Sequence, residues 1–249
     1  MIRFVYEGLP RYWGWVVRRL KAAARAVGLL AWLERRRNRQ AFFYLRALFA
    51  YYDIEDMAHL DVPFWVLRAA YRVDAFLADR EGKALVFEYG AGASSLWLAR
   101  RAARVVSVDH DEAWAAVVRR LAAGMPHLSL TVLPPGERQA AGPYRSGDPL
   151  MRGRSFEGYV RSIENAGGPF DLIAIDGRAR ADCLRTALPY LKDDGLIVFD
   201  NAYRPRYRKA IRDSGLRLRR FRGAVPGLPF PEETMLLSRD AAARWLDDR

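Results

Sequence analysis

Two acidic residues and a glycine turn between them form the first group that could bind a ligand. An apolar run ends in Glu88, and the chain then turns at Gly90 and Gly92 into a pattern that predicts a helix from about Ser94. Glycine permits a tight turn and lets a ligand approach the backbone closely. The free N–H groups at a helix start suit a carboxylate or phosphate. Asp109 ends a second apolar run, where a carboxylate can bind both hydroxyls of a ribose.

The spacing of the glycines distinguishes a dinucleotide from a cationic or amino-bearing nucleotide ligand. The dinucleotide fingerprint has a third glycine where this chain has Ser95. An acid just before the turn also suits a cationic or amino-bearing ligand better than a pyrophosphate. A nicotinamide-dependent reductase is therefore disfavoured. Strand, glycine turn, helix, second strand and terminal acid in this order are far more specific than the glycines alone.

Polar residues that follow two later strands predict the reacting end of the site. Asp176 ends the apolar run that begins at Phe170, and Asp200 with Asn201 ends the run that begins at Gly195. Ligands of open α/β sheets bind beyond the carboxyl ends of the strands. Three oxygen ligands from adjacent strand ends, completed by water, are typical of a Mg²⁺ site. The alternative is that these residues only shape their loops.

Asp176 and His110 are the predicted catalytic residues, since a carboxylate or an imidazole at this edge could remove a proton from an acceptor. A bound metal would assist by lowering the pKa of the acceptor oxygen. His59 is expected at a helix start and Cys183 on the buried face of a helix, both as structural residues. The single cysteine excludes an internal disulfide framework and favours a reducing, cytoplasmic setting.

Strand-like and helical segments alternate regularly from residue 84 onward. The predicted strands are Ala84–Tyr89, Arg104–Asp109, Leu128–Leu133, Phe170–Asp176, Gly195–Asp200, Leu216–Arg222 and Thr234–Ser238. The predicted helices are Ser94–Ala103, Glu112–Ala123, Phe156–Asn165, Arg180–Leu191 and Arg206–Ser214. This alternation predicts an α/β fold with parallel strands, right-handed crossovers and helices on both faces. A Gly/Pro-rich loop at 223–233 joins the last two strands, so the final strand is expected to be antiparallel.

In these motifs, residues 84–239 resemble the class I S-adenosylmethionine-dependent methyltransferases. The closer likeness is to a bacterial and plant methyltransferase-like group with an EYGxGxSxLW segment, here Glu88 to Trp97, and an IDGR segment, here Ile175 to Arg178. The resemblance implies a seven-stranded Rossmann-like sheet and S-adenosylmethionine as the cofactor. It also implies the cofactor-binding residues, which are Glu88, Tyr89, Gly90, Gly92, Ser94, Ser95, Asp109, His110 and Asp176.

The placement of Asp176, Asp200 and Asn201 is similar to that in metal-dependent catechol and caffeoyl-type O-methyltransferases. This resemblance implies Mg²⁺-assisted O-methylation of a small or lipid-linked acceptor. Those enzymes carry a lysine three residues after the first acid, whereas this chain has Ala179 there. Arg178 and Arg180 flank that position but stay protonated. We therefore expect them to clamp an acidic substrate.

Residues 1–82 are expected to form a basic helical region ahead of a methyltransferase domain at 83–249. Apolar residues at helical spacing predict one stripe on a first helix, made by Trp13, Val17, Leu20, Ala24, Val27 and Ala31. The basic residues Arg11, Arg18, Lys21 and Arg25 fall on its other side. A second helix is predicted at Ala41–Tyr52, and a third from Asp61 as N-cap with Pro63 in its first turn.

The positive charge is concentrated in this region. Ten basic residues lie between residues 11 and 46 with Glu34 as the single acid, in a chain of net charge +12. The arginines could face water on helices that cap the domain, form a dimer face, or contact an anionic membrane surface. The sequence shows no secretory leader and no window apolar enough to span a membrane. The expected location is therefore cytoplasmic or peripheral at the membrane.

Two further functions remain as alternatives. Charge alone would suit a protein that binds or modifies nucleic acid, but the Asp/Asn-Pro-Pro-aromatic motif of amino-group methylases is missing and Leu133 to Gly136 follows the wrong strand. The other alternative is a non-catalytic scaffold that binds S-adenosylmethionine. The long segments 134–168 and 223–233 are expected to form a lid. The side chains expected to face the substrate are Tyr144, Arg145, Arg152, Arg154 and Tyr159.

Overall fold

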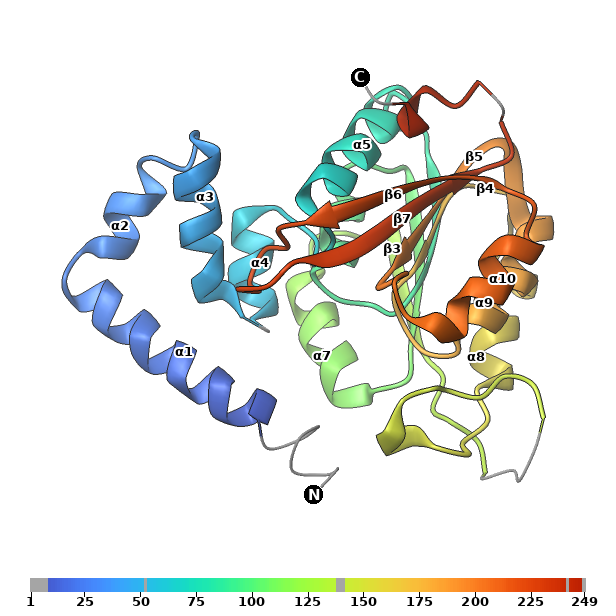
Figure 1. Ribbon diagram of the computed structural model, residues 1–249, viewed down its shortest axis with the longest axis horizontal. Coiled ribbons are helices and arrows are strands. Elements are labelled where there is room, and N and C mark those ends of the chain that lie inside the picture. The colour runs from blue at the N-terminus through green and yellow to red at the C-terminus, as the bar shows by residue number, and fades with distance from the viewer. Residues whose placement is uncertain (1–8, 52, 138–141, 241, 248–249) are drawn as a thin grey trace.

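A seven-stranded mixed sheet forms the centre of the computed structural model, which describes residues 9–51, 53–137, 142–240 and 242–247 (Figure 1). The strand order is β3-β2-β1-β4-β5-β7-β6. The strands are β1 (Leu85–Tyr89), β2 (Arg104–Asp109), β3 (Leu128–Val132), β4 (Phe170–Ile175), β5 (Leu191–Asp200), β6 (Arg217–Gly223) and β7 (Glu232–Ser238). Strands β1 to β5 pair in parallel, and β7 runs antiparallel to β5 and β6. The predicted fold and its antiparallel last strand are confirmed.

Side chains that alternate along the strands divide the core into two layers. Phe87 and Tyr89 face one side, where they join the core beneath α8 (Glu157–Arg161), α9 (Arg180–Ala187) and α10 (Arg208–Asp213). Val86 faces the other side, with α5 (Leu67–Ala78) and α6 (Ala93–Ala99). Parallel strands covered on both faces read as continuous apolar runs. That is why the central strands were predictable.

Helix α4 (Ile54–Leu60) is absent from the predicted elements. Its N-cap is Asp53, whose carboxylate accepts a hydrogen bond from the backbone N–H of Asp56. Asp61, predicted to start the third helix, instead ends α4 in a left-handed conformation with φ 56°. The following helix, α5, begins only at Leu67. The prediction was wrong because an acid followed by Pro63 can mark a helix end as well as a start.

The basic N-terminal segment forms α1 (Leu9–Ala26), α2 (Leu29–Glu34) and α3 (Gln40–Ala47), which lie beside the sheet in Figure 1. The predicted stripe of the first helix is only partly correct: Ala24 is buried, but Ala31 lies beyond Gly28, which has φ 74° and separates α1 from α2. Leu20 and Val27 are exposed, while Val17 is buried. Tyr52 and the side chains of residues 9–13, including Arg11 and Trp13, lie outside the described part of the chain.

Two of the basic residues in this segment point inward. Lys21 Nζ lies 2.8 Å from a carboxylate oxygen of Asp53 and 2.7 Å from one of Asp56. Arg46 is buried, and its guanidinium donates to both carboxylate oxygens of Asp56 and to Glu34. These ion pairs fasten α1 and α3 to α4. Part of the positive charge between residues 11 and 46 is therefore internal.

The chain before residue 83 also contributes to the core of the sheet domain. Trp65, Val73 and Phe76 belong to the same apolar cluster as the strand residues. The backbone N–H of Val66 donates to Thr234 Oγ1 on β7, at 3.0 Å. The division drawn at residues 82 and 83 therefore does not separate two cores, because α5 is an integral part of the sheet's covering layer.

The remaining elements that the structure describes are one helix and six short 3-10 turns. They are α7 (Glu112–Leu121), η2 (Leu48–Ala50), η3 (Pro149–Met151), η4 (Ser162–Asn165), η5 (Leu188–Tyr190), η6 (Pro205–Tyr207) and η7 (Arg244–Leu246). Tyr159, predicted to face the substrate, is buried in the core beneath α8. No helix in the described ranges has the length and apolar character that a bilayer crossing requires.

Candidate functional site

A cavity of about 450 Å³ opens where the carboxyl ends of β1, β2, β4 and β5 meet. Eight of the predicted site residues line it, namely Gly90, Gly92, Ser94, Asp109, His110, Asp176, Asp200 and Asn201. Glu88, Tyr89 and Ser95 do not. Tyr89 is buried in the core, and its hydroxyl donates to the carbonyl of Val160 at 2.7 Å. Its side chain is therefore too remote to contact a ligand in the cavity, because β1 turns it toward α8.

Gly90 forms the floor of this cavity and tolerates no side chain. Its φ of 98° is in the left-handed region. A Cβ atom there would lie 2.7 Å from the backbone N and Cα of Gly177 and 2.9 Å from the carbonyl carbon of Asp176. The turn after β1 thus packs directly on the turn after β4, since the two strands are neighbours.

Glu88 lies directly behind this turn, completely buried. Its carboxylate accepts hydrogen bonds from the hydroxyls of Ser94 (2.5 Å), Ser95 (2.5 Å) and Ser107 (2.6 Å). Ser95 Oγ in turn accepts the backbone N–H of Gly92 at 3.0 Å. Burial raises the pKa of Glu88 to about 7, although the three hydroxyl donors act in the opposite direction. In this arrangement Glu88 holds the glycine turn in place through Ser95 and does not itself face the cavity.

Asp109 lines the cavity at the end of β2 and is held by backbone donors. Its carboxylate accepts the N–H groups of Ala91 (3.0 Å), His110 (2.6 Å) and Asp111 (2.9 Å). A carboxylate has about four acceptor positions. Oδ2, which accepts only from Ala91 among these donors, can accept a further hydrogen bond. Trp114 closes this side, because its indole N–H donates to the carbonyl of Ala91 at 2.7 Å.

His110 is poorly placed to act as a base. Its Nδ1 lies 3.1 Å from Asp109 Oδ1, and its Nε2 accepts a hydrogen bond from Arg178 Nε at 3.1 Å. Both ring nitrogens are therefore engaged within the protein, and the lone pair that would take a proton faces a guanidinium. His59, the other histidine discussed above, lies in the last turn of α4, where its Nε2 is 2.9 Å from Glu34.

Arg180 occupies the space between the two predicted metal-binding acids. Its buried guanidinium donates to Asp176 Oδ1 at 2.9 Å and to the carbonyls of Gly177 (2.9 Å) and Asp200 (2.5 Å), and it lies 3.6 Å from Asp200 Oδ2. Asn201 directs its amide N–H group to Glu232 at 3.3 Å.

This arrangement does not fit Mg²⁺. A divalent cation at Asp176 and Asp200 would lie against a fixed guanidinium that already neutralises part of their charge. Among the described residues, no group of three or more His, Cys, Asp and Glu side chains is arranged to hold a metal. The arrangement therefore gives the predicted Mg²⁺ site no support, because the first turn of α9 folds Arg180 back over the end of β4.

The electrostatics of Asp176 suit proton transfer. Burial, and then the nearby Asp200 carboxylate, raise its pKa well above the ordinary value, while Arg180 acts to lower it. Trp65 Nε1 lies 3.3 Å from Asp176 Oδ2 and fixes the carboxyl group from the opposite side. Asp176 therefore has one oxygen toward Arg180 and one toward Trp65.

Several residues that line the cavity were not singled out from the sequence. They include Tyr51, Phe64, Trp114, Arg204, Phe230 and Glu232. Burial, and then Asp200, raise the pKa of Glu232. The loop 223–233 was expected to cover the site, and Leu228, Phe230 and Glu232 do line the cavity. The aromatic residues before α5 carry no local signal for such a role.

The chain is similar to one family model and to several solved structures. Residues 87–202 match a family model described as a methyltransferase domain. The cofactor-bound protein Rv0187 from MTB is 21% identical over 78% of this chain and 90% of its own, with a TM-score of 0.51. A methyltransferase-like protein from Silicibacter pomeroyi is 18% identical over 67% and 86% of the two chains, with a TM-score of 0.42. No functionally curated protein matches the sequence.

Proposed function

We propose that this protein is a class I S-adenosylmethionine-dependent methyltransferase and that it methylates an oxygen atom of a small acceptor; the match of residues 87–202 to a methyltransferase domain and the fold support the proposal. The observation that carries the proposal is the cavity on the glycine turn. It lies at the carboxyl ends of the strands, its floor at Gly90 has no room for a Cβ atom, and Asp109 lies at its side. A ligand can thus lie directly on the backbone there.

The charges along the cavity suit the cofactor. When bound, S-adenosylmethionine supplies an activated methyl group on a positively charged sulfonium. Asp109 would accept hydrogen bonds from its ribose hydroxyls, and Trp114 would provide an apolar wall beside the adenine. Asp176 and Asp200 are acids at the other end of the same cavity. Carboxylates there favour a cationic group over a phosphate.

Asp176 is the residue that we propose to receive the acceptor's proton. A carboxylate whose pKa is raised is a stronger base than an ordinary aspartate. Trp65 and Arg180 hold its two oxygens, so the group is oriented before the acceptor arrives. Asp176 would take the O–H proton of the acceptor, which would leave an oxygen lone pair free to accept the methyl group that the bound cofactor supplies. This route uses no metal ion.

The first prediction tests cofactor binding. In isothermal titration, S-adenosylmethionine and S-adenosylhomocysteine should bind at one site, whereas NADH should give no saturable heat. Asp109→Ala should weaken binding about 10- to 100-fold, because a hydrogen bond to a charged group contributes about 1.5–3 kcal/mol. Glu112→Ala, which removes an exposed carboxylate at the start of α7, is the matched control. Binding of NADH in preference to S-adenosylmethionine would reject the proposed function.

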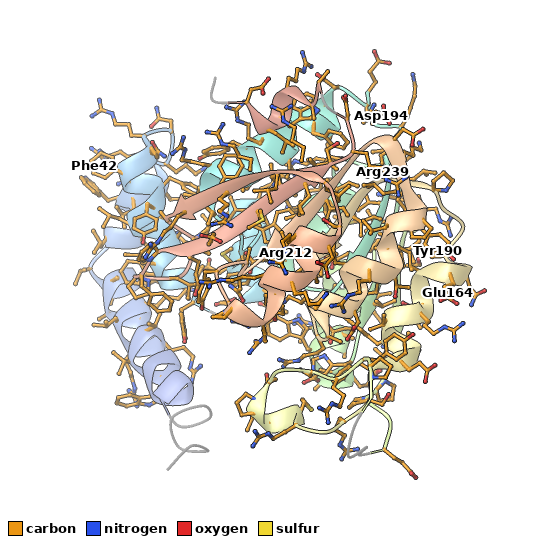
Figure 2. The ribbon with its side chains drawn as sticks, turned by 45° about the vertical axis from the view of Figure 1, so that its right-hand side comes forward. Phe42, Glu164, Tyr190, Asp194, Arg212 and Arg239 are labelled. Carbon is orange, nitrogen blue, oxygen red and sulfur yellow. The ribbon has the colours of Figure 1, made fainter. Side chains whose placement is uncertain are left out.

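We propose in addition that α1 and α2 contact an anionic membrane surface. Three exposed side chains support this, since Trp15, Leu20 and Val27 are exposed by 49%, 54% and 78%. Arginines stack on two exposed indoles of the same helices, Arg19 on Trp15 and Arg36 on Trp32. Tryptophan and arginine side by side suit the boundary between headgroups and acyl chains. Phe42, on the neighbouring helix α3, lies at the outer edge of the molecule (Figure 2).

The second prediction follows from that surface. The full chain should sediment with vesicles that contain anionic phosphatidylserine, and not with vesicles of phosphatidylcholine alone. Raising the salt concentration should release it, because exposed charges are screened. Trp15→Ala combined with Leu20→Ala should lower the bound fraction at least ~5-fold. Leu150→Ala, which removes an exposed leucine from the loop near α9, is the control. Equal binding to both kinds of vesicle, or to neither, would contradict the proposal.

A further inference from the structure

A second cavity, of about 960 Å³, lies beside the first. It is enclosed by the loop at residues 145–153, the first turn of α9 and η6. Arg180 lines both cavities. The loop is the yellow segment with the short η3 turn in Figure 1. The loop was predicted to form part of a lid, but nothing in the sequence indicated a cavity beneath it.

Arginines dominate the wall of this second cavity. Its basic lining residues are Arg145, Arg152, Arg180 and Arg206. Arg206 lies over the ring of Tyr207, 5.0 Å from its centroid, and donates to the carbonyl of Gly147 at 3.2 Å. Arg152 is exposed and has no hydrogen-bond or ion-pair partner among the residues that the structure describes.

The two acids in the same wall already have partners. Asp148 forms an ion pair with Arg178. Asp182 accepts the backbone N–H of Tyr144 at 3.1 Å and lies 2.7 Å from Arg185. Arg178 and Arg185 do not line this cavity. Neither acid pairs with Arg152 or Arg206, so these two arginines give the wall of the cavity a positive charge.

Arg178 connects the two cavities. Its guanidinium bonds Asp148 in the wall of the second cavity and His110 in the wall of the first. A molecule in the second cavity therefore lies next to the Asp176–Arg180 end of the first, where the acceptor's proton would be removed.

We propose that the second cavity binds the anionic part of the methyl acceptor, a carboxylate or a phosphate group. The inference rests on the proposed function, because it names the class of acceptor for the same reaction. Guanidinium groups bind both anions through charge-assisted hydrogen bonds. The acceptor would then be an acid or phosphate ester that extends its reacting hydroxyl group toward Asp176.

The test uses the full chain with two separate probes. Binding of inorganic phosphate is measured by line broadening in phosphorus NMR, and binding of benzoate by saturation-transfer NMR. Arg152→Glu should weaken binding of at least one probe ~10-fold or more. Arg212→Glu, an identical charge reversal on α10 (Figure 2), should change it less than ~2-fold. Which probe binds distinguishes a phosphate from a carboxylate acceptor.

Two results would overturn this inference. One is an equal loss in both variants, which would show a general effect of net charge. The other is a wild-type protein that binds neither probe. Titration with S-adenosylmethionine shows independently whether the proposed function holds. Both variants should bind the cofactor as the wild type does, since neither residue lines the cofactor cavity.

Discussion

Replacing Gly90 by alanine should abolish cofactor binding and lower the free energy of unfolding by about 2–4 kcal/mol. The residue has φ 98°, which alanine adopts only with strain. The new Cβ would meet the backbone of Gly177 at 2.7 Å, and backbone cannot move aside as a flexible side chain can. The turn after β1 or the turn after β4 must shift, and both line the cavity.

Urea denaturation and isothermal titration with S-adenosylmethionine measure the two effects. The matched control is Gly158→Ala in α8, where an added Cβ meets no atom within 4 Å. Alanine is the better helix former, so this variant should be as stable as the wild type or up to ~1 kcal/mol more stable. If Gly90→Ala were also neutral in both measurements, the close approach of the two turns could not be what shapes the site.

The strands were predictable because burial on both faces leaves a local signature. All residues of β4 from Phe170 to Ile175 are buried, and such strands appear in the sequence as continuous apolar runs bounded by turn residues. The acids at their ends could also be placed, because parallel strands bring their carboxyl ends to one edge. Asp109, Asp176 and Asp200 do line one cavity.

The orientation of the N-terminal helices could not be predicted in the same way. The helical spacing of the apolar residues assigned Lys21 to the side opposite the apolar stripe. Its partners Asp53 and Asp56 lie more than thirty residues away. An ion pair between distant segments has no periodic signal, so the helical pattern of apolar residues alone gave the wrong face. Arg46 is buried for the same reason, by Asp56 and Glu34.

The guanidinium at the predicted metal site could not be foreseen, for a different reason. The positions of Asp176, Asp200 and Asn201 were correct, but the direction of Arg180 was not visible in the sequence. Ala179 adopts φ 46°, a left-handed conformation that alanine rarely takes. The chain therefore reverses there, and the next side chain lies between the two carboxylates. Trp65 was missed because only the tertiary fold brings it to Asp176, 111 positions further along the chain.

Glu88 should make the stability of this protein depend on pH, and Glu88→Gln should remove that dependence. The folded pKa of about 7 lies above the ordinary value of 4.5. Between these values the folded protein retains a proton that the unfolded chain loses, so stability falls as pH rises. The stabilisation is complete below about pH 4.5 and is lost as pH rises through about 7. The whole shift corresponds to about 3 kcal/mol.

The measurement is urea denaturation of wild type and Glu88→Gln at several pH values. From about pH 5 to pH 8 the stability of the variant relative to the wild type should rise by about 2–3 kcal/mol. All other titrating groups are common to both proteins and cancel in the difference. Glu112→Gln, at an exposed carboxylate, should show no such trend. A constant difference across this range would mean that Glu88 is ionised throughout.

The same variant separates two roles of Glu88 in cofactor binding. If the carboxylate contacts the amino group of S-adenosylmethionine, as the family resemblance implies, Glu88→Gln should weaken binding as strongly as Asp109→Ala. The structure favours a supporting role, because the carboxylate is enclosed by three serine hydroxyls and acts on the turn through Ser95 and Gly92. The glutamine Oε1 atom can still accept from Ser95, and its amide can donate to Ser94. We therefore expect less than ~10-fold loss of affinity, while a larger loss in a fully folded variant would assign Glu88 to direct contact with the ligand.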